Sequence, residues 1–94
     1  MNHVFEVIDK TGRKIRLTKE QWEHIKRDHL LVEEEEIKHT LINPLKITPK
    51  SRNKYFYYQY FKSKKLPYRH LKVVVRYLNG NGFVITSHFV KHII

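Results

Sequence analysis

The sequence contains no cysteine, and only three glycines and three prolines among its 94 residues. Without cysteine the chain has no disulfide, no thiol nucleophile and no cysteine-ligated zinc, which fits a reducing cytoplasm. No run of about 18 uncharged apolar residues is present, so we expect no transmembrane helix and no membrane partner. The first residues also lack the charged-then-apolar layout of a signal peptide. These absences predict a cytoplasmic protein.

Acidic residues are missing from most of the chain. All nine Asp and Glu lie within residues 1–36, where seven Lys and Arg leave a balance of −2. Residues 37–94 carry twelve Lys and Arg and no acid, a balance of +12. Such a segment cannot neutralise its own field and should attract a polyanion, usually nucleic acid. The alternative interpretation is a basic surface that only keeps the protein soluble.

The length allows one small domain, residues 1–94, and excludes an enzyme with a cleft between two domains. The 40% apolar content, with five Phe, six Tyr and one Trp, argues against disorder.

Residue patterns predict an α+β domain. The helices are expected over residues 19–29, capped by Thr18 with Gln21 as capping-box partner, and 33–42, ending at Asn43 and Pro44. Four glutamates in the first turn of the second helix suit its dipole. Strands are expected over residues 4–8, 13–17, 45–48, 54–61, 71–78 and 83–90, with an exposed basic loop at 62–67. We therefore predict an N-terminal hairpin and two helices packed on a four-stranded antiparallel sheet.

Seven histidines make metal binding the first chemistry to consider. His24 and His29 are five residues apart, so they do not form the i, i+4 pair of helical zinc sites. His88 and His92 are four apart, but in a strand-like segment. With no cysteine and no acid after Glu36, we expect no metal and no cofactor. The same acid count argues against a two-carboxylate glycosidase and a two-metal nuclease.

Acid–base chemistry on a charged substrate remains. In RNA cleavage a base takes the proton of the 2′-hydroxyl, which attacks its own phosphate, and an acid protonates the departing 5′-oxygen. Cations and hydroxyls stabilise the charge on the phosphorane. Because the substrate supplies the nucleophile, a small fold with His, Arg, Lys, Thr and Tyr suffices.

Several residues are candidates for this chemistry, and each also has an ordinary structural interpretation. His24 lies off the apolar stripe of its helix, where Asp28 is placed to orient it, but it also fits an exposed surface position. His29 lies on the stripe at the end of the helix, where it fits either a catalytic histidine or a partly buried structural one. Thr86 and His88 share one strand face. The substrate-binding candidates are Arg76, Lys72, Tyr58 and Lys54, which also fit a solvated or packed sheet; the hairpin register is not fixed by the sequence.

The order of these motifs resembles a phage-associated nuclease family of the barnase–EndoU–colicin–RelE (BECR) superfold. Residues 15–29 are similar to its "LT…W.HI…RH" opening, and Asn43 and Pro44 to its helix-ending step. Tyr57 and Tyr58 match its aromatic strand. The closing "VVV…G.(I/V)(I/V)T" hairpin is matched by residues 71–75 and 82–89. The resemblance covers residues 5–90.

The resemblance implies a BECR-like nuclease domain with its site in a cleft between the first helix and the sheet. It also implies metal-independent RNA cleavage, often by a toxin, with His24, Arg27 and His29 on the helix and Thr86 on the last strand. The chain departs from the family at residue 30, where Leu30 replaces the usual proline. His88 stands where tyrosine is common.

We therefore predict a toxin-like endoribonuclease with His24 as general acid or base and His29 or His88 as its partner. Arg27 and Arg76 would hold phosphate, and Thr86 would steady a non-bridging oxygen. An acidic antitoxin is the expected protein partner. The alternatives are a non-catalytic RNA- or DNA-binding module with the same basic, aromatic sheet, and an interaction domain that docks an acidic protein.

Overall fold

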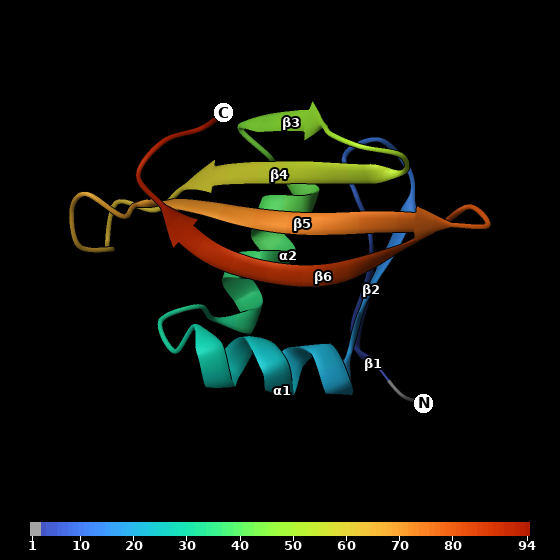
Figure 1. Cartoon of the computed structure of the whole chain (residues 1–94), viewed down its shortest axis with the longest axis horizontal. Helices are drawn as coiled ribbons and strands as arrows, with labels where there is room; N and C mark the ends of the chain where they lie inside the picture. Colours follow the sequence, from blue (N-terminus) through green and yellow to red (C-terminus); the bar gives the residue numbers. More distant parts are fainter. Residues whose placement is uncertain (1–2) are drawn as a thin grey trace.

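The computed structural model describes residues 3–94, which form two α-helices and one six-stranded sheet (Figure 1). The elements in chain order are β1 (His3–Ile8), β2 (Lys14–Thr18), α1 (Lys19–Asp28), α2 (Glu34–Ile42), β3 (Lys46–Pro49), β4 (Lys54–Tyr60), β5 (His70–Leu78) and β6 (Asn81–Val90). The α+β class is confirmed, and every element ends within two residues of its predicted bounds. Across residues 3–94 no helix has both the length and the apolar character that a bilayer crossing requires.

The predicted four-stranded sheet is wrong in one respect, because the N-terminal hairpin belongs to the sheet instead of packing on it. The strand order is β1-β2-β6-β5-β4-β3. All neighbouring strands are antiparallel except β2 and β6, where Ile15 lies opposite Gly82. A Cβ at Gly82 would lie 2.9 Å from both Ile15 Cγ1 and Tyr77 Cε1, so glycine permits this close approach. Alternation along a strand does not specify which distant strand lies beside it, which is why the sequence did not predict this pairing.

Helix α1 is fixed at its start by a cap and along its length by β6. The Thr18 hydroxyl accepts a hydrogen bond from the Gln21 backbone N–H at 3.2 Å, as predicted. The Gln21 side chain does not complete a capping box; it donates to the carbonyl oxygen of Ile85 in β6 at 2.6 Å. Ile85 is the extra residue of a bulge in β6, since Val74 pairs with Thr86 and the next residue of β5 with Val84. The bulge therefore anchors the helix.

Helix α2 begins with the predicted acidic turn. Glu33 and Glu36 form a capping box, in which the Glu33 backbone N–H donates to Glu36 Oε1 at 3.0 Å. Glu36 also forms an ion pair with Lys64 Nζ at 3.0 Å, and the Lys64 side chain is only 16% exposed. The expectation of an exposed 62–67 loop is thus wrong for Lys64, because the largely buried carboxylate of Glu36 in α2 binds its ammonium group.

A buried carboxylate joins the hairpin to the middle of the sheet. Asp9, at the end of β1, is only 4% exposed. It accepts hydrogen bonds from the backbone N–H groups of Thr11 (3.0 Å) and Arg13 (2.8 Å) and from the hydroxyls of Tyr57 and Tyr77. Burial opposes the charge and raises the pKa of Asp9, but the hydrogen bonds outweigh it and the pKa lies below the ordinary 3.8. Asp9 therefore remains ionised at neutral pH and links β1, β4 and β5.

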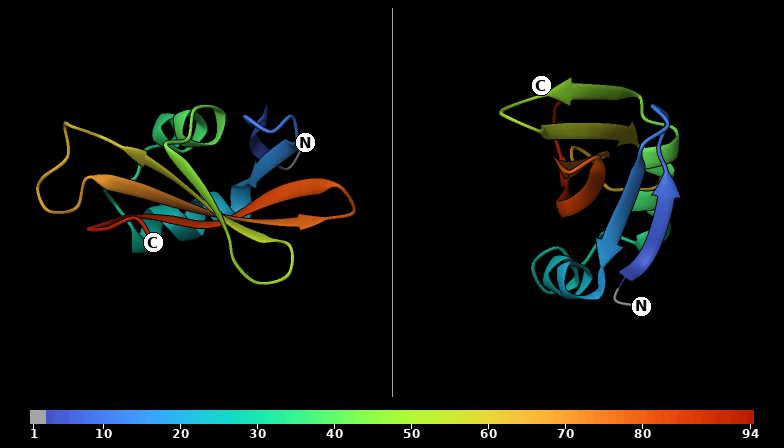
Figure 2. Two further views of the ribbon diagram at one scale, coloured as in Figure 1. Left: turned by 90° about the horizontal axis from the view of Figure 1, so that it is seen from above. Right: turned by 90° about the vertical axis from the view of Figure 1, so that its right-hand side faces the viewer.

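The two faces of the sheet differ. Helix α2 lies behind β4 and β5 in Figure 1, and α1 lies along β6 at the lower edge (Figures 1 and 2). The hydrophobic core between α2 and the sheet contains Phe5, Ile15, Leu17, Ile25, Ile37, Leu41, Tyr57, Leu71, Val73, Val75 and Val84. Because side chains alternate along strands, the opposite face, here called the open face, carries Lys54, Phe56, Lys72, Val74, Arg76, Thr86 and His88.

Candidate functional site

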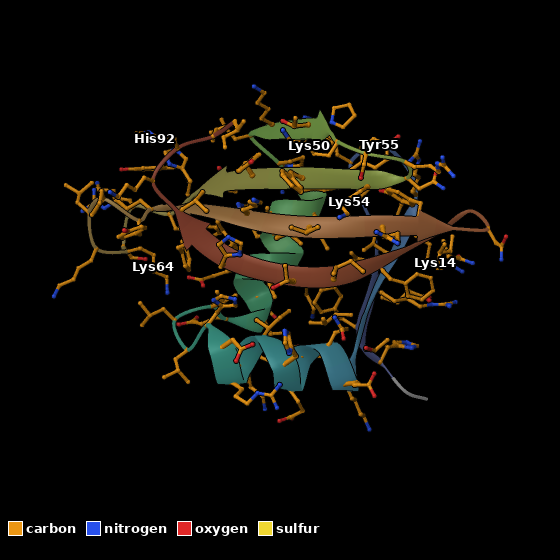
Figure 3. All side chains as sticks on the ribbon, viewed as in Figure 1. Lys14, Lys50, Lys54, Tyr55, Lys64 and His92 are labelled. Atoms are coloured by element: carbon orange, nitrogen blue, oxygen red, sulfur yellow. The ribbon has the colours of Figure 1, made fainter. Side chains whose placement is uncertain are left out.

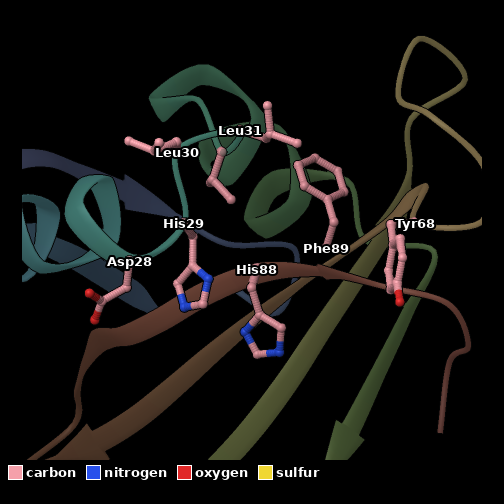
Figure 4. A pocket seen from close by; sticks show the side chains of 8 residues that line it. Asp28, His29, Leu30, Leu31, Tyr68, His88 and Phe89 are labelled. Carbon is pink, nitrogen blue, oxygen red and sulfur yellow. The ribbon is translucent and has the colours of Figure 1, made fainter.

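The end of α1 meets β6 at two histidines. His29 follows α1 directly, and its backbone N–H donates to the carbonyl oxygen of Ile25 at 2.7 Å. His88 projects from β6. The two imidazole rings stack with centroids 5.1 Å apart and planes inclined by 28° (Figure 4). We call this contact the His29–His88 pair.

The surroundings of His88 favour its neutral form. Burial lowers the pKa of His88 below its ordinary value of 6.5, and the nearby charges of Lys72 and His29 lower it further. Its Nδ1 is buried and has no hydrogen-bond partner among the described residues. A neutral imidazole has a free nitrogen lone pair at pH 7, so His88 is able to accept a proton.

A cation and a hydroxyl lie beside His88 on the sheet. Lys72 of β5 is directly opposite His88 in the strand register. Burial, followed by the charge of Lys50, lowers the pKa of Lys72. Thr86 precedes His88 by two residues on the open face and is partly exposed, whereas Ser87 between them is fully buried. The predicted sharing of one face by Thr86 and His88 is confirmed.

His24 and Arg27 form a separate cluster on α1 with Asp28. His24 Nε2 lies 3.3 Å from Asp28 Oδ2, and Arg27 Nη2 lies 3.1 Å from His24 Nδ1. Both ring nitrogens of His24 thus have partners on its own helix. The structure supports the expectation that Asp28 orients His24. Asp28 in turn lies next to His29 at the edge of a pocket (Figure 4).

An apolar pocket of about 460 Å³ adjoins the His29–His88 pair. Its walls are formed by Asp28, His29, Leu30, Leu31, Val32, Tyr68, His88 and Phe89. The sequence patterns predict neither this pocket nor the participation of Tyr68. The available signal was the run of three apolar residues, 30–32, in the connection between two helices.

Arg76 and Lys54 lie away from the histidines. They are opposite each other in the register of β4 and β5. Arg76 pairs with Phe83 of β6, so it meets neither Thr86 nor Ser87. Four residues separate Arg76 from Lys72, about 13 Å along a strand. Arg76 and Lys54 therefore form a second cationic group on the open face, and Figure 3 shows Lys54 over this part of the sheet.

The aromatic residues of β4 divide between the two faces, as their alternation predicts. Tyr58, predicted to bind substrate, is fully buried, so it offers no exposed ring for stacking. On the same side of β4 as Tyr58, Phe56 is partly exposed and Tyr60, at the end of the strand, is 43% exposed. Lys72 Nζ lies 4.1 Å and Lys50 Nζ 5.3 Å from the centroid of Phe56.

Positive charge on β3–β5 is not neutralised within the described residues. No carboxylate of residues 3–94 lies within ion-pair distance of Lys46, Lys50, Lys54, Lys72 or Arg76. The same part of the chain contains no group of three His, Cys, Asp or Glu side chains positioned to hold a metal ion.

Comparison with known proteins identifies no relative. No family model matches the chain, and neither a curated protein nor a solved structure matches it. The resemblance to the BECR nuclease family stays a prediction from the sequence motifs.

Proposed function

We propose that this protein is a metal-independent endoribonuclease that cleaves RNA by attack of a 2′-hydroxyl on the neighbouring phosphate. The observation that carries the proposal is the His29–His88 pair, which is bordered on the sheet by the cation of Lys72 and the hydroxyl of Thr86. These are the groups that such a reaction requires.

Each group has a role in the proposed reaction. His88, whose pKa is lowered, takes the proton from the 2′-hydroxyl as that oxygen bonds to phosphorus. His29 gives a proton to the 5′-oxygen as its bond to phosphorus breaks, which leaves a 2′,3′-cyclic phosphate and a free 5′-hydroxyl. Lys72 and Thr86 contact the non-bridging oxygens, where charge accumulates. The general-base role thus passes from His24, the sequence-based candidate, to His88.

The remaining candidates act around this centre. His24 and Arg27 are positioning residues, because they hold Asp28 at the end of α1 next to His29. Arg76 and Lys54 contact RNA phosphates farther from the bond that breaks. A cytoplasmic, toxin-like role with an acidic antitoxin belongs to the same proposal.

The test is cleavage of a 5′-labelled RNA oligonucleotide in the presence of EDTA. The wild type should cut RNA but not the same sequence as DNA, because DNA lacks the nucleophile. His88→Ala should lose at least about a hundredfold in rate, the usual contribution of a general base. His92→Ala is the matched control, since His92 is an exposed histidine outside the site. Absence of cleavage by the wild type, or full activity of His88→Ala, would overturn the proposal.

The second candidate function is a non-catalytic RNA- or DNA-binding module. The unpaired cations on β3–β5 and the Phe56 ring between Lys50 and Lys72 favour it. Salt-dependent binding of RNA by a wild type that never cuts RNA would select this function over the enzyme.

A further inference from the structure

We infer that the apolar pocket beside the His29–His88 pair binds the nucleobase of the nucleotide whose 2′-hydroxyl reacts. This inference rests on the proposed function and names the part of the substrate that the pocket takes. In the proposed reaction only His29 and His88 of the residues that line the pocket take part in proton transfer, and the rest of the pocket is free to hold another part of the substrate.

The walls of the pocket combine two kinds of surface. Asp28, His29 and His88 form the side toward the reaction centre, and the other wall is apolar (Figure 4). Its volume of about 460 Å³ falls within the range of about 300–1,000 Å³ that is typical of small-molecule sites. A few polar groups at one edge of an apolar cavity orient a ligand that is apolar on its faces and polar at one end.

The shape and chemistry of the walls select a planar aromatic group. Four rings line the pocket, those of His29, Tyr68, His88 and Phe89. Rings stack favourably on nucleobases whatever the base. A phosphate would lose its hydration against the apolar wall without gaining hydrogen bonds there, so the anionic part of the ligand must stay outside.

Cations at the rim are placed to attract that anionic part. Lys91 Nζ lies 5.7 Å from the centroid of Tyr68. Lys64 Nζ lies 5.1 Å from the centroid of Phe89, but Glu36 already neutralises its charge. Lys91 thus places positive charge near Tyr68, and Lys72 places it near the histidines. An aromatic base joined to a phosphate matches this arrangement, and a neutral apolar side chain does not use the cations.

The pocket also leaves apolar surface uncovered. Leu30 and Leu31 are 83% and 72% exposed, although they line a cavity. Covering this surface with a base removes it from water, which favours binding.

The test compares a nucleoside 3′-monophosphate with inorganic phosphate by isothermal titration calorimetry on the whole chain. Adenosine and uridine 3′-monophosphates should each bind at least about tenfold more tightly than inorganic phosphate. Tyr68→Ala should remove most of this advantage, because a base loses about five- to hundredfold in affinity when its aromatic stacking partner is truncated. Leu31→Ala should also weaken nucleotide binding, because it removes part of the apolar wall that the base would cover. Tyr68 is half-exposed and Leu31 more so, so both variants are expected to fold.

Leu78→Ala is the matched control, since Leu78 is a half-exposed leucine at the far end of β5. It should leave both affinities unchanged. Equal affinity for nucleotide and inorganic phosphate would overturn the inference, and so would unchanged nucleotide affinity in both pocket variants. Equal affinity is the result expected if the pocket instead binds a side chain of another protein. Base-dependent binding without any RNA cleavage would refute the proposed enzyme and leave the pocket assignment standing.

Discussion

Replacing Asp9 with alanine is expected to lower the free energy of unfolding by about 2–4 kcal/mol. The change removes the acceptor for five donor groups, the backbone N–H groups of Thr11 and Arg13 and the hydroxyls of Thr11, Tyr57 and Tyr77, which join the β1–β2 turn to β4 and β5. Because β5 carries Lys72, this link also supports the sheet side of the candidate site.

The magnitude follows from which donors water can reach. Thr11 and Arg13 are exposed, so water can replace Asp9 as the acceptor for their backbone N–H groups. The cost there is only that the turn is held less firmly. The Tyr57 and Tyr77 hydroxyls are buried and both donate to Asp9; without Asp9 one can still donate to the other, and the second is left without an acceptor. A buried donor without an acceptor costs about 1–3 kcal/mol, and the loosened turn adds about 1 kcal/mol. A full buried-charge penalty does not apply, because the variant removes the charge itself.

Urea denaturation followed by tryptophan fluorescence measures this loss. Thr11→Val is the control, since it removes one hydroxyl donor and leaves the carboxylate in place, and we expect a loss below about 1 kcal/mol. A loss below about 1 kcal/mol for Asp9→Ala would refute the reasoning. The folded-state pKa of Asp9 is depressed, so its contribution is present above pH 3.8 and is lost as pH falls through the lower folded-state value. The difference between wild type and Asp9→Ala should therefore shrink below pH 3.8.

Three further predictions concern the site and the sheet. Because the pKa of His88 is depressed, kcat/KM should rise with pH through an apparent pKa below 6.5. Lys72→Gln should raise this apparent pKa, because it removes a positive charge that lowers the pKa of His88. An apparent pKa above 6.5 in the wild type would contradict the role of His88. Gly82→Ala should lower the urea-derived stability by about 1–3 kcal/mol, because the new methyl would meet two side chains at 2.9 Å, and an unchanged midpoint would show that β2 and β6 are not so closely packed. Arg76→Gln and Lys54→Gln should each reduce the slope of log K against log salt for RNA binding by about one, and an unchanged slope would remove them from the RNA interface.

The local structure could be predicted from the sequence, because short-range rules determine it. The cap at Thr18 and the end of α2 at Asn43 are set by neighbouring residues alone. The pairing of β2 with β6 depends on long-range packing of Ile15 against Gly82, and no residue pattern specifies a parallel neighbour. The hairpin was therefore predicted correctly as an element and placed wrongly in the architecture.

The candidate site was predictable in its residue types but not in its pairing. Helix periodicity correctly separated His24 from the apolar stripe and joined it to Asp28. The contact of His29 with His88 depends on where α1 ends relative to β6, and the bulge at Ile85 contributes to that placement. A bulge shifts the faces of a strand without a clear sequence signal. Tyr68 could not be predicted either, because it lies in the loop between β4 and β5 and no periodic pattern governs loops.

The parallel pairing of β2 with β6 has a consequence for the order of assembly on the ribosome. Translation produces β6 after every other strand, yet β6 occupies the middle of the sheet and has β2 on one side and β5 on the other. A nascent chain that has not yet released residues 81–90 from the exit tunnel leaves β2 and β5 without their shared neighbour. Closing contacts between such distant segments is slow, as for other topologies rich in non-local pairs. His88 lies on this strand, so a growing chain cannot form the His29–His88 pair before residues 81–90 have left the exit tunnel.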